Sequence, residues 1–400
     1  MAAVEVPDSR ARLVTREFLI VSLATFAYFL SVGVLLPTLP RYVEEGLGGS
    51  AVAVGASFTA YGLAAIAVRP VLPWFAKRYG QRAMMLTGAA VSTLTVALHP
   101  AARHLAPLLI LRMAMGVGEA MLFVGAATII NDIAPSSRRA EAASYFSVAV
   151  FAGIGLGPMI GDPLADEGRY TAAFLAGAAF VGMSWLVSWL VPRRVGPASA
   201  GVAADGKRTR LFHPVGVLTG VVLTSAMVGY TGWNAFMPLR ADEVGANAGL
   251  LFLVYSLFVL VLRLAAARVP ERVGLGRCAA SALVVIGGAL GVMAAAPGLG
   301  GLWVGTLVLG VGITFLYPSL MAITVNAVPE EERASVVSTF TMFFEVGGTI
   351  GGVLLGAVAA LTDYQGAFAA GGVIAIAGLG LLWRNVIVPR RDAAAQQSLL

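Results

Sequence analysis

Long apolar stretches of about 20 residues, separated by short polar segments, follow one another along almost the whole chain of 400 residues. A helix of about this length crosses the hydrocarbon core of a bilayer. Lipid cannot hydrogen-bond to free backbone groups, and the stretches are far longer than barrel strands, so helices are the expected spanning element. The pattern predicts an all-α polytopic membrane protein with twelve transmembrane helices, at residues 18–38, 51–73, 83–100, 105–130, 141–162, 171–192, 214–238, 248–268, 279–296, 302–327, 335–361 and 367–388.

Composition agrees with this pattern and limits what else the chain can contain. Hydrophobic residues make up 58% of the chain, charged residues 12%, and the mean hydropathy is +0.85, which soluble globular proteins do not reach. A net charge of +6 would suit a nucleic-acid partner, but the basic residues are scattered through short loops beside apolar helices. Retention of positive charge in cytoplasmic loops explains that distribution better. We therefore expect a surrounding lipid bilayer and no nucleic acid.

The distribution of the 27 Lys and Arg residues sets the expected orientation. Most of them lie in the two tails and the even-numbered loops, whereas the odd-numbered loops hold only Arg41, Arg103, Arg169 and Arg240. Both termini are therefore expected in the cytoplasm, with the protein in the cytoplasmic membrane. The polar first 16 residues show no cleavage site behind a short apolar core, so we expect the first helix to be retained.

The chain contains an internal repeat in which residue n corresponds to residue n + 194 without gaps. The matches include residue types that chance rarely aligns in an apolar chain, such as Arg69 with Arg263 and Pro135 with Pro329. Two parallel six-helix units predict pseudo-twofold symmetry about the membrane normal, as in transporters that rock two bundles around a midplane site. A duplicated structural membrane protein is the alternative. The predicted parts are an N-terminal six-helix bundle, a cytoplasmic linker, and a C-terminal six-helix bundle with its tail, at residues 1–192, 193–213 and 214–400.

The fifth predicted helix carries a pattern of small residues, GIGLGPMIGD at 153–162. This pattern resembles the antiporter signature of the major facilitator superfamily, and within that family the twelve-helix drug:proton antiporters. The resemblance covers residues 16–388. It implies that the small residues form a groove and that the proline perturbs the backbone, while a purely structural helix contact is the alternative. The residues of this helix 5 motif are Gly153, Gly157, Pro158, Gly161 and Asp162, the last of which replaces a family glycine.

A second pattern, PWFAKRYGQR at 73–82, is similar to a turn that latches the cytoplasmic side of this family shut. Lys77 stands where the family has an acid, whereas the counterpart in the second half keeps an acid as Glu271. The eleventh helix begins with Glu330, Glu331 and Glu332, and the fifth begins with two arginines. We therefore predict two ion pairs of opposite polarity between the halves: Lys77 or Arg78 with Glu330 to Glu332, and Glu271 with Arg138 or Arg139. The alternative is that all of these are solvated loop charges that contribute little to stability. The residues of this predicted cytoplasmic latch are Lys77, Arg78, Gly80, Glu271, Arg272, Arg138, Arg139 and Glu332.

Two carboxylates lie deep within the predicted spans, Glu119 in the fourth helix and Glu345 in the eleventh, one from each half. Burial disfavours the charged form of a carboxyl group, so such a residue can bind and release a proton as access alternates. Arg112, in a helix 4 pattern (LLILRMAMGVGEA at 108–120) that also resembles the family, lies two turns from Glu119 on the same face. We assign proton coupling to these three residues. A static Glu119–Arg112 ion pair, or an Arg112 that extends to the outer interface, are the alternatives.

The resemblance implies that helices 1, 4, 7 and 10 line a central cavity. Aromatic and amide groups can stack on a ring or a cation, although Tyr and Trp near span ends are also routine interfacial anchors. The candidate residues of the substrate cavity are Tyr28, Phe29, Tyr230, Trp233, Asn234 and Tyr317. We expect no metal site and no cofactor, because the histidines lie at separate loop edges and a GxxxxGK[ST] motif for ATP is absent.

These features favour a secondary active transporter, and not an enzyme, that exports a small amphipathic organic compound in exchange for protons. Its expected partners are the substrate, protons and lipid, and it is expected to be a monomer. A proton-coupled importer of a sugar or organic acid on the same fold is the first alternative, and a non-transporting membrane receptor the second. No nucleophile, base and metal constellation of an enzyme is visible. Fold and coupling do not specify the cargo.

Overall fold

The computed structural model describes residues 14–135, 138–193, 213–266, 268–329 and 332–384. Within these ranges twelve apolar helical segments are long enough to cross a membrane, which confirms the predicted number, and no strand occurs. The predicted linker lies almost wholly outside the described residues, as do Glu330 and Glu331. The elements of the first half are α1(Arg16–Arg41), η1(Tyr42–Gly46), α2(Ala51–Val68), η2(Arg69–Val71), α3(Leu72–Tyr79), α4(Gln81–Leu98), η3(His99–Ala101), α5(Leu105–Ile133), α6(Arg139–Leu156), α7(Pro158–Asp166) and α8(Tyr170–Ser188). Those of the second half are α9(Pro214–Glu243), α10(Ala248–Ala265), α11(Val269–Val273), α12(Leu275–Ala295), α13(Leu299–Val325), α14(Arg333–Leu361) and α15(Tyr364–Leu382).

The first helix shows how local chemistry and tertiary packing set the ends of the spans. The Thr15 hydroxyl accepts a hydrogen bond from the amide of Phe18 at 3.2 Å and so caps α1. Pro37 and Pro40 remove two backbone donors close to residue 38, where the polar segments of the sequence predict the end of this span. Both prolines are buried, however, and the helix continues through them into η1. Packing against neighbouring helices therefore overrides the local signal.

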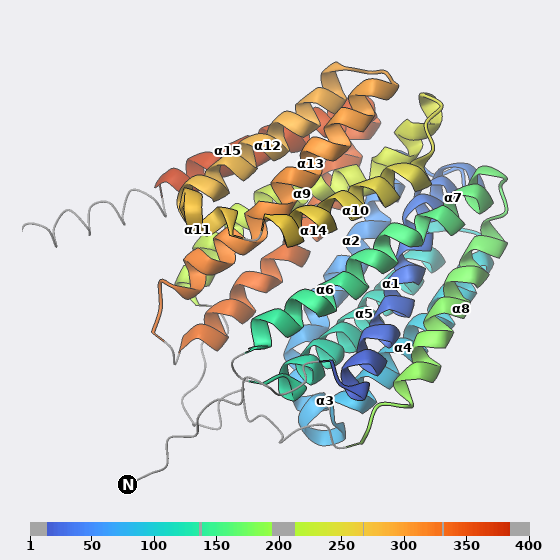
Figure 1. The fold of residues 1–400 in the computed structure, drawn as a ribbon. Coiled ribbons are helices and arrows are strands. Elements are labelled where there is room, and N and C mark those ends of the chain that lie inside the picture. The colour runs from blue at the N-terminus through green and yellow to red at the C-terminus, as the bar shows by residue number, and fades with distance from the viewer. Residues whose placement is uncertain (1–13, 136–137, 194–212, 267, 330–331, 385–400) are drawn as a thin grey trace, which may run out of the picture.

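The helices form two bundles, one from α1 to α8 and the other from α9 to α15, as the blue-to-green and yellow-to-red ribbons of Figure 1 show. In the first bundle α1 packs on α6 and α8, and in the second α9 packs on α14 and α15. These are equivalent helices under the offset of 194 residues. We call the end of the molecule where α1 begins and α15 ends the terminal face, and the end that carries η1 and η3 the opposite face.

The two bundles meet along two equivalent helix contacts, α2 with α14 and α10 with α6 and α7. Near the opposite face a side chain at Gly55 would overlap the carbonyl oxygen of Gly352. At the equivalent position of the other contact, a Cβ at Gly249 would lie 2.9 Å from the Pro158 carbonyl oxygen and 2.9 Å from the Asp162 Cβ. Small residues thus let the helix backbones approach closely at both contacts.

The helix 5 motif packs inside the first bundle. A Cβ at Gly153 would lie 2.8 Å from backbone atoms of α1, and Gly157 and Gly161 face the same helix with no room for a side chain. Equivalent glycines of α14 pack on α9. The helix is interrupted between α6 and α7, because Pro158 lacks an amide donor. Its counterpart α14 runs without interruption from Arg333 to Leu361. Close packing is therefore common to both halves, and the break belongs to the first half only.

Candidate functional site

An ion pair joins the two bundles at the end of the α2–α14 contact where α2 ends. Nη2 of Arg69, directly after α2, lies 2.6 Å from Oε1 of Glu345, in the fourth turn of α14. Their side chains are 26% and 24% exposed, so neither is fully enclosed by protein. Arg69 also donates to the Thr341 hydroxyl at 3.5 Å. Sequence reasoning identified Glu345 but not its partner, although Arg69 is a charged residue within a predicted span and recurs in the repeat.

The equivalent place in the other contact has a different chemistry. Arg263 corresponds to Arg69, and its guanidinium lies 4.5 Å from the ring centroid of Phe151, the counterpart of Glu345. A cation over an aromatic ring is attracted to it without any titratable group. One contact between the halves is therefore ionic and the other is a cation–π contact.

Glu119 lies on α5, within the first half, whereas Glu345 lies on α14 of the second. In the same bundle as Glu119, the Tyr28 hydroxyl lies 3.2 Å from the Ser92 hydroxyl. The two carboxylates that the sequence places at the midplane thus come from helices of different halves, and only Glu345 forms an ion pair among the described residues.

Arg112 lies deep within the first bundle. Its residue exposure is 5%, so it does not extend to the membrane interface. Its guanidinium carbon lies 4.5 Å from the Tyr61 ring centroid and 5.9 Å from that of Phe58. None of the ion pairs in the described part of the chain includes Arg112, so a direct ion pair with Glu119 is not formed in this conformation. This conformation therefore agrees neither with a static Glu119–Arg112 ion pair nor with an Arg112 side chain that extends to the outer interface.

The aromatic residues assigned to the substrate cavity lie in two groups, each within one bundle. Tyr28 is fully buried and contacts Phe29, with ring centroids 5.6 Å apart. Trp233 is also fully buried, donates to the Thr306 hydroxyl at 3.3 Å and stacks on Tyr230. The remaining two residues are Asn234, which donates to the Tyr230 carbonyl at 2.9 Å, and Tyr317, whose ring lies 5.5 Å from that of Phe340. Tyr28 and Trp233 expose no surface in this conformation, so their contact with a substrate stays a prediction.

A buried charge cluster closes the opposite face. Nη1 of Arg41 lies 2.8 Å from Oδ1 of Asp162, and the same guanidinium pairs with Asp242 of the second half. Next to it, the Tyr364 hydroxyl donates to Glu44 at 2.5 Å and again links the halves. One feature of the sequence points to this cluster, namely Asp162 in place of a family glycine. Asp162 supplies the acid that neutralises Arg41 inside the protein.

The predicted latch residues lie at the terminal face, and among the described residues no ion pair joins Lys77 or Arg78 to Glu332. Lys77 and Glu271 are exposed, whereas Arg138 pairs with Glu141 at 2.8 Å and Glu332 with His213 at 3.1 Å. The latch pairs therefore stay a prediction for another conformation. On this side a cavity of about 320 Å³ separates α6 of the first half from α10 and α13 of the second.

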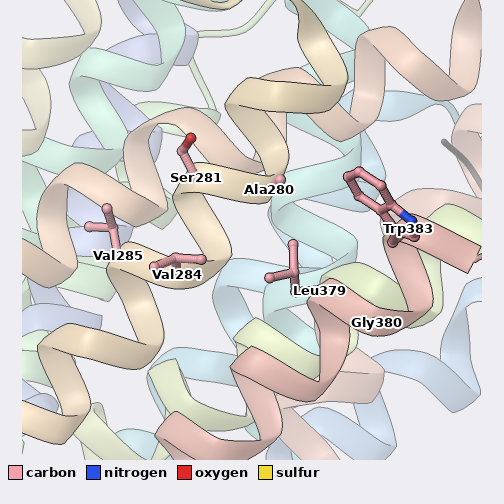
Figure 2. Close-up of a pocket in the computed structure, with 7 residues that line it drawn as sticks. All are labelled: Ala280, Ser281, Val284, Val285, Leu379, Gly380 and Trp383. Atoms are coloured by element: carbon pink, nitrogen blue, oxygen red, sulfur yellow. The ribbon is translucent and has the colours of Figure 1, made fainter.

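A larger cavity lies away from these charges. It has a volume of about 700 Å³ and lies between α12 and α15, where Figure 2 shows apolar side chains and one serine on the two helices. Val284 and Trp383 are about half exposed there, so the cavity opens to the outside of the bundle. Apolar walls on an outer surface suit lipid chains. Among the described residues no group of three or more His, Cys, Asp and Glu side chains could hold a metal ion.

Comparisons with known proteins agree with this architecture. An uncharacterized MFS-type transporter of Salmonella typhimurium is 26% identical over 376 residues, which cover 90% of this chain and 94% of the relative. The crystal structure of the nucleoside transporter NupG matches with a TM-score of 0.74 at 16% identity, over 92% of this chain and 99% of that one. A POT family transporter in complex with 5-aminolevulinic acid matches with a TM-score of 0.78 at 14% identity, over 93% and 96%. The pattern of the Major Facilitator Superfamily matches residues 21–247 and 220–399, and this chain therefore belongs to that family of membrane transporters.

Proposed function

We propose that this transporter exports a small amphipathic organic compound in exchange for protons, by alternating exposure of a site between its two halves. The observation that carries the proposal is the Arg69–Glu345 ion pair, which joins the halves at 2.6 Å while both side chains stay partly exposed. A proton that binds Glu345 removes its negative charge and the ionic attraction to Arg69. Proton binding and separation of the halves at this point are therefore linked.

A second acid supports the same reading. Glu119 is a second carboxyl group deep within the spans, and it comes from the other half. Oε2 of Glu345 is buried and has no hydrogen-bond partner among the described residues, so this oxygen has room for a proton. Two carboxyl groups, one from each half, suit a carrier that releases protons on one side as it releases substrate on the other.

The helix 5 motif supports export as the direction of transport. Its glycines pack as in any close helix pair, but the break at Pro158 has no counterpart in the second half. Together with the resemblance to drug:proton antiporters, this asymmetric break favours export. We assign the terminal face to the cytoplasm, because most of the described Lys and Arg residues lie there.

The test begins with a resistance profile of a bacterial strain that lacks its own exporters, with and without this protein. Any compound to which resistance rises is then offered to everted membrane vesicles under an imposed pH gradient, acid inside. We expect uptake that depends on the gradient in the wild type and is lost in Glu345→Gln. Glu167→Gln, which removes a carboxylate that is 58% exposed, is the matched control and should leave uptake intact.

Two outcomes would decide against the proposal. Uptake that stays gradient-dependent in Glu119→Gln, Glu345→Gln and the double variant would exclude both carboxyl groups as proton carriers. Accumulation by right-side-out vesicles with a proton gradient directed inward would identify an importer instead.

A further inference from the structure

Arg112 is a strong hydrogen-bond donor group held in an apolar setting. Its Nε donates to the carbonyl oxygen of Ser57 at 3.2 Å, and Nη1 contacts the sulfur of Met115 at 3.3 Å. A thioether is a weak acceptor, so this contact leaves most of the donor capacity unused. No oxygen acceptor is assigned to either terminal nitrogen in the part of the chain that the structure describes. The hydrogen bond from Nε thus holds the guanidinium in place, while its two terminal nitrogens remain available for an oxygen acceptor.

Among the described residues no acid forms an ion pair with Arg112. The nearest acid along its helix, Glu119, lies about 10 Å further on by helical rise. Its other titratable neighbours, Tyr28 and Tyr61, are neutral when protonated. An isolated charge inside a membrane protein is costly, so an arginine in this position marks a functional site.

A small cavity adjoins the guanidinium. Its volume is about 100 Å³. This space holds a carboxylate group and a few carbon atoms, since one water takes about 30 Å³. Apart from Arg112, the walls are aliphatic, aromatic or thioether side chains, namely Val32, Leu35, Leu36, Leu39, Phe58, Tyr61 and Met115. A positive head with apolar walls is complementary to an organic anion with a short apolar body.

We propose that Arg112 binds the carboxylate of the transported compound, and that the substrate class is a small apolar monocarboxylate. The planar fork of arginine matches a carboxylate with two parallel hydrogen bonds, which a cationic or neutral compound cannot provide. The cavity is lined by side chains of α1, α2 and α5, so the carboxylate would sit within the first half. This inference rests on the proposed transport function and names its substrate class.

The test is equilibrium binding of radiolabelled propionate and butyrate to the purified protein in lipid nanodiscs, without a pH gradient. We expect saturable binding that unlabelled butyramide, the neutral isostere of butyrate, does not compete. Arg112→Gln should weaken binding at least about tenfold, since hydrogen bonds to charged groups are the strong ones. Arg112→Lys should bind between these limits, because it keeps the charge and loses the fork.

A second variant guards against misfolding of the Arg112 variants. Leu36→Trp fills the cavity but keeps Arg112, and should abolish binding, whereas Leu63→Trp makes the same change at a side chain that is 50% exposed and should not. Arg169→Gln, at an arginine that is 57% exposed, is the matched charge control. Equal binding to the wild type and Arg112→Gln, or no binding of either probe to the wild type, would overturn the proposal. Neither result bears on proton coupling, which the vesicle experiment tests separately.

Discussion

The charge of Arg41 is compensated by acidic side chains of the protein and not by solvent. Its side chain and that of Asp162 are 3% and 4% exposed, and Asp242 supplies a second acid from the other half. When one partner of a buried ion pair is removed, the other is left as an uncompensated charge in a medium of low polarity. The cluster therefore both stabilises the first bundle and ties it to the second.

Arg41→Ala should lower the free energy of unfolding by about 3–5 kcal/mol, because it strands the Asp162 carboxylate. Arg169→Ala breaks an ion pair whose side chains are 57% and 58% exposed, and should cost at most about 1 kcal/mol. Denaturant titration in mixed micelles measures both values. If the loss comes from the stranded charge, Arg41→Ala combined with Asp162→Asn should recover part of it. An equal effect of the two single variants would contradict this account.

Sequence patterns found the residues whose placement is costly, but not their partners. Glu119, Glu345 and Arg112 stand out because a charge within an apolar stretch needs a reason. Asp242 gave no such signal, since it lies at the end of a span where charges are ordinary. Its pairing with Arg41 depends on the approach of α1 to α9, which hydropathy does not encode.

At the scale of helices, two kinds of close contact differ in what they hold together. Gly157 meets the backbone of α1 inside the first bundle, whereas Gly55 meets α14 across the two halves. In both places an added methyl group would overlap backbone atoms. Alternating access requires the second kind of contact to open and the first to persist.

Gly157→Ala should therefore lower the stability of the protein, and Gly55→Ala should instead shift its conformation. We expect a loss of about 1–3 kcal/mol for Gly157→Ala, the usual cost of overpacking. Gly55→Ala should cost less, because the halves can part at the opposite face. Accessibility of a cysteine at position 44, after replacement of the single native Cys278, measures that opening by reaction with a polar thiol reagent. Unchanged labelling of the Gly55→Ala protein would argue against a contact that opens.

Hydropathy predicted the elements well because each span must be apolar over its length, and all twelve are present in the described residues. It was less reliable at their ends. The second span continues through η2 and α3 to Tyr79, six residues past the expected end at 73, with Arg69 inside it. Charged residues can lie inside a span where a partner from another helix neutralises them, and Glu345 does so here.

For the molecule as a whole, the repeat predicts equivalent contacts, and their differences indicate how the two sides are used. The Arg69–Glu345 pair titrates through its carboxyl group, whereas Arg263 over Phe151 has no group that takes up a proton in the physiological range. Protonation should therefore release the α2–α14 contact and leave the α6–α10 contact unchanged.

Phe151→Glu should make the two contacts alike by giving Arg263 an ionic partner. Since two partly exposed ion pairs must then part, and each contributes about 1 kcal/mol, we expect transport to slow roughly fivefold at neutral pH. The defect should shrink as the pH falls and the new carboxyl group becomes protonated. Transport rates at several pH values measure this, with Phe151→Leu as a control that lacks the acid. A pH-independent loss in Phe151→Glu would point to misfolding.

The terminal face must close when the opposite face opens, and the predicted latch supplies charges for that step. Lys77 is exposed here and Glu332 pairs with His213, so neither is committed to a contact across the halves in this conformation. We expect Lys77→Glu to impair transport by placing like charges at the closing surfaces, and Glu332→Lys in the same chain to restore it. Transport assays of the single and double variants measure this. Rescue depends on which residues meet, because solvated charges that never touch would show additive effects. A double variant as impaired as Lys77→Glu alone would remove Glu332 as its partner, and closure would then rest on contacts other than this pair.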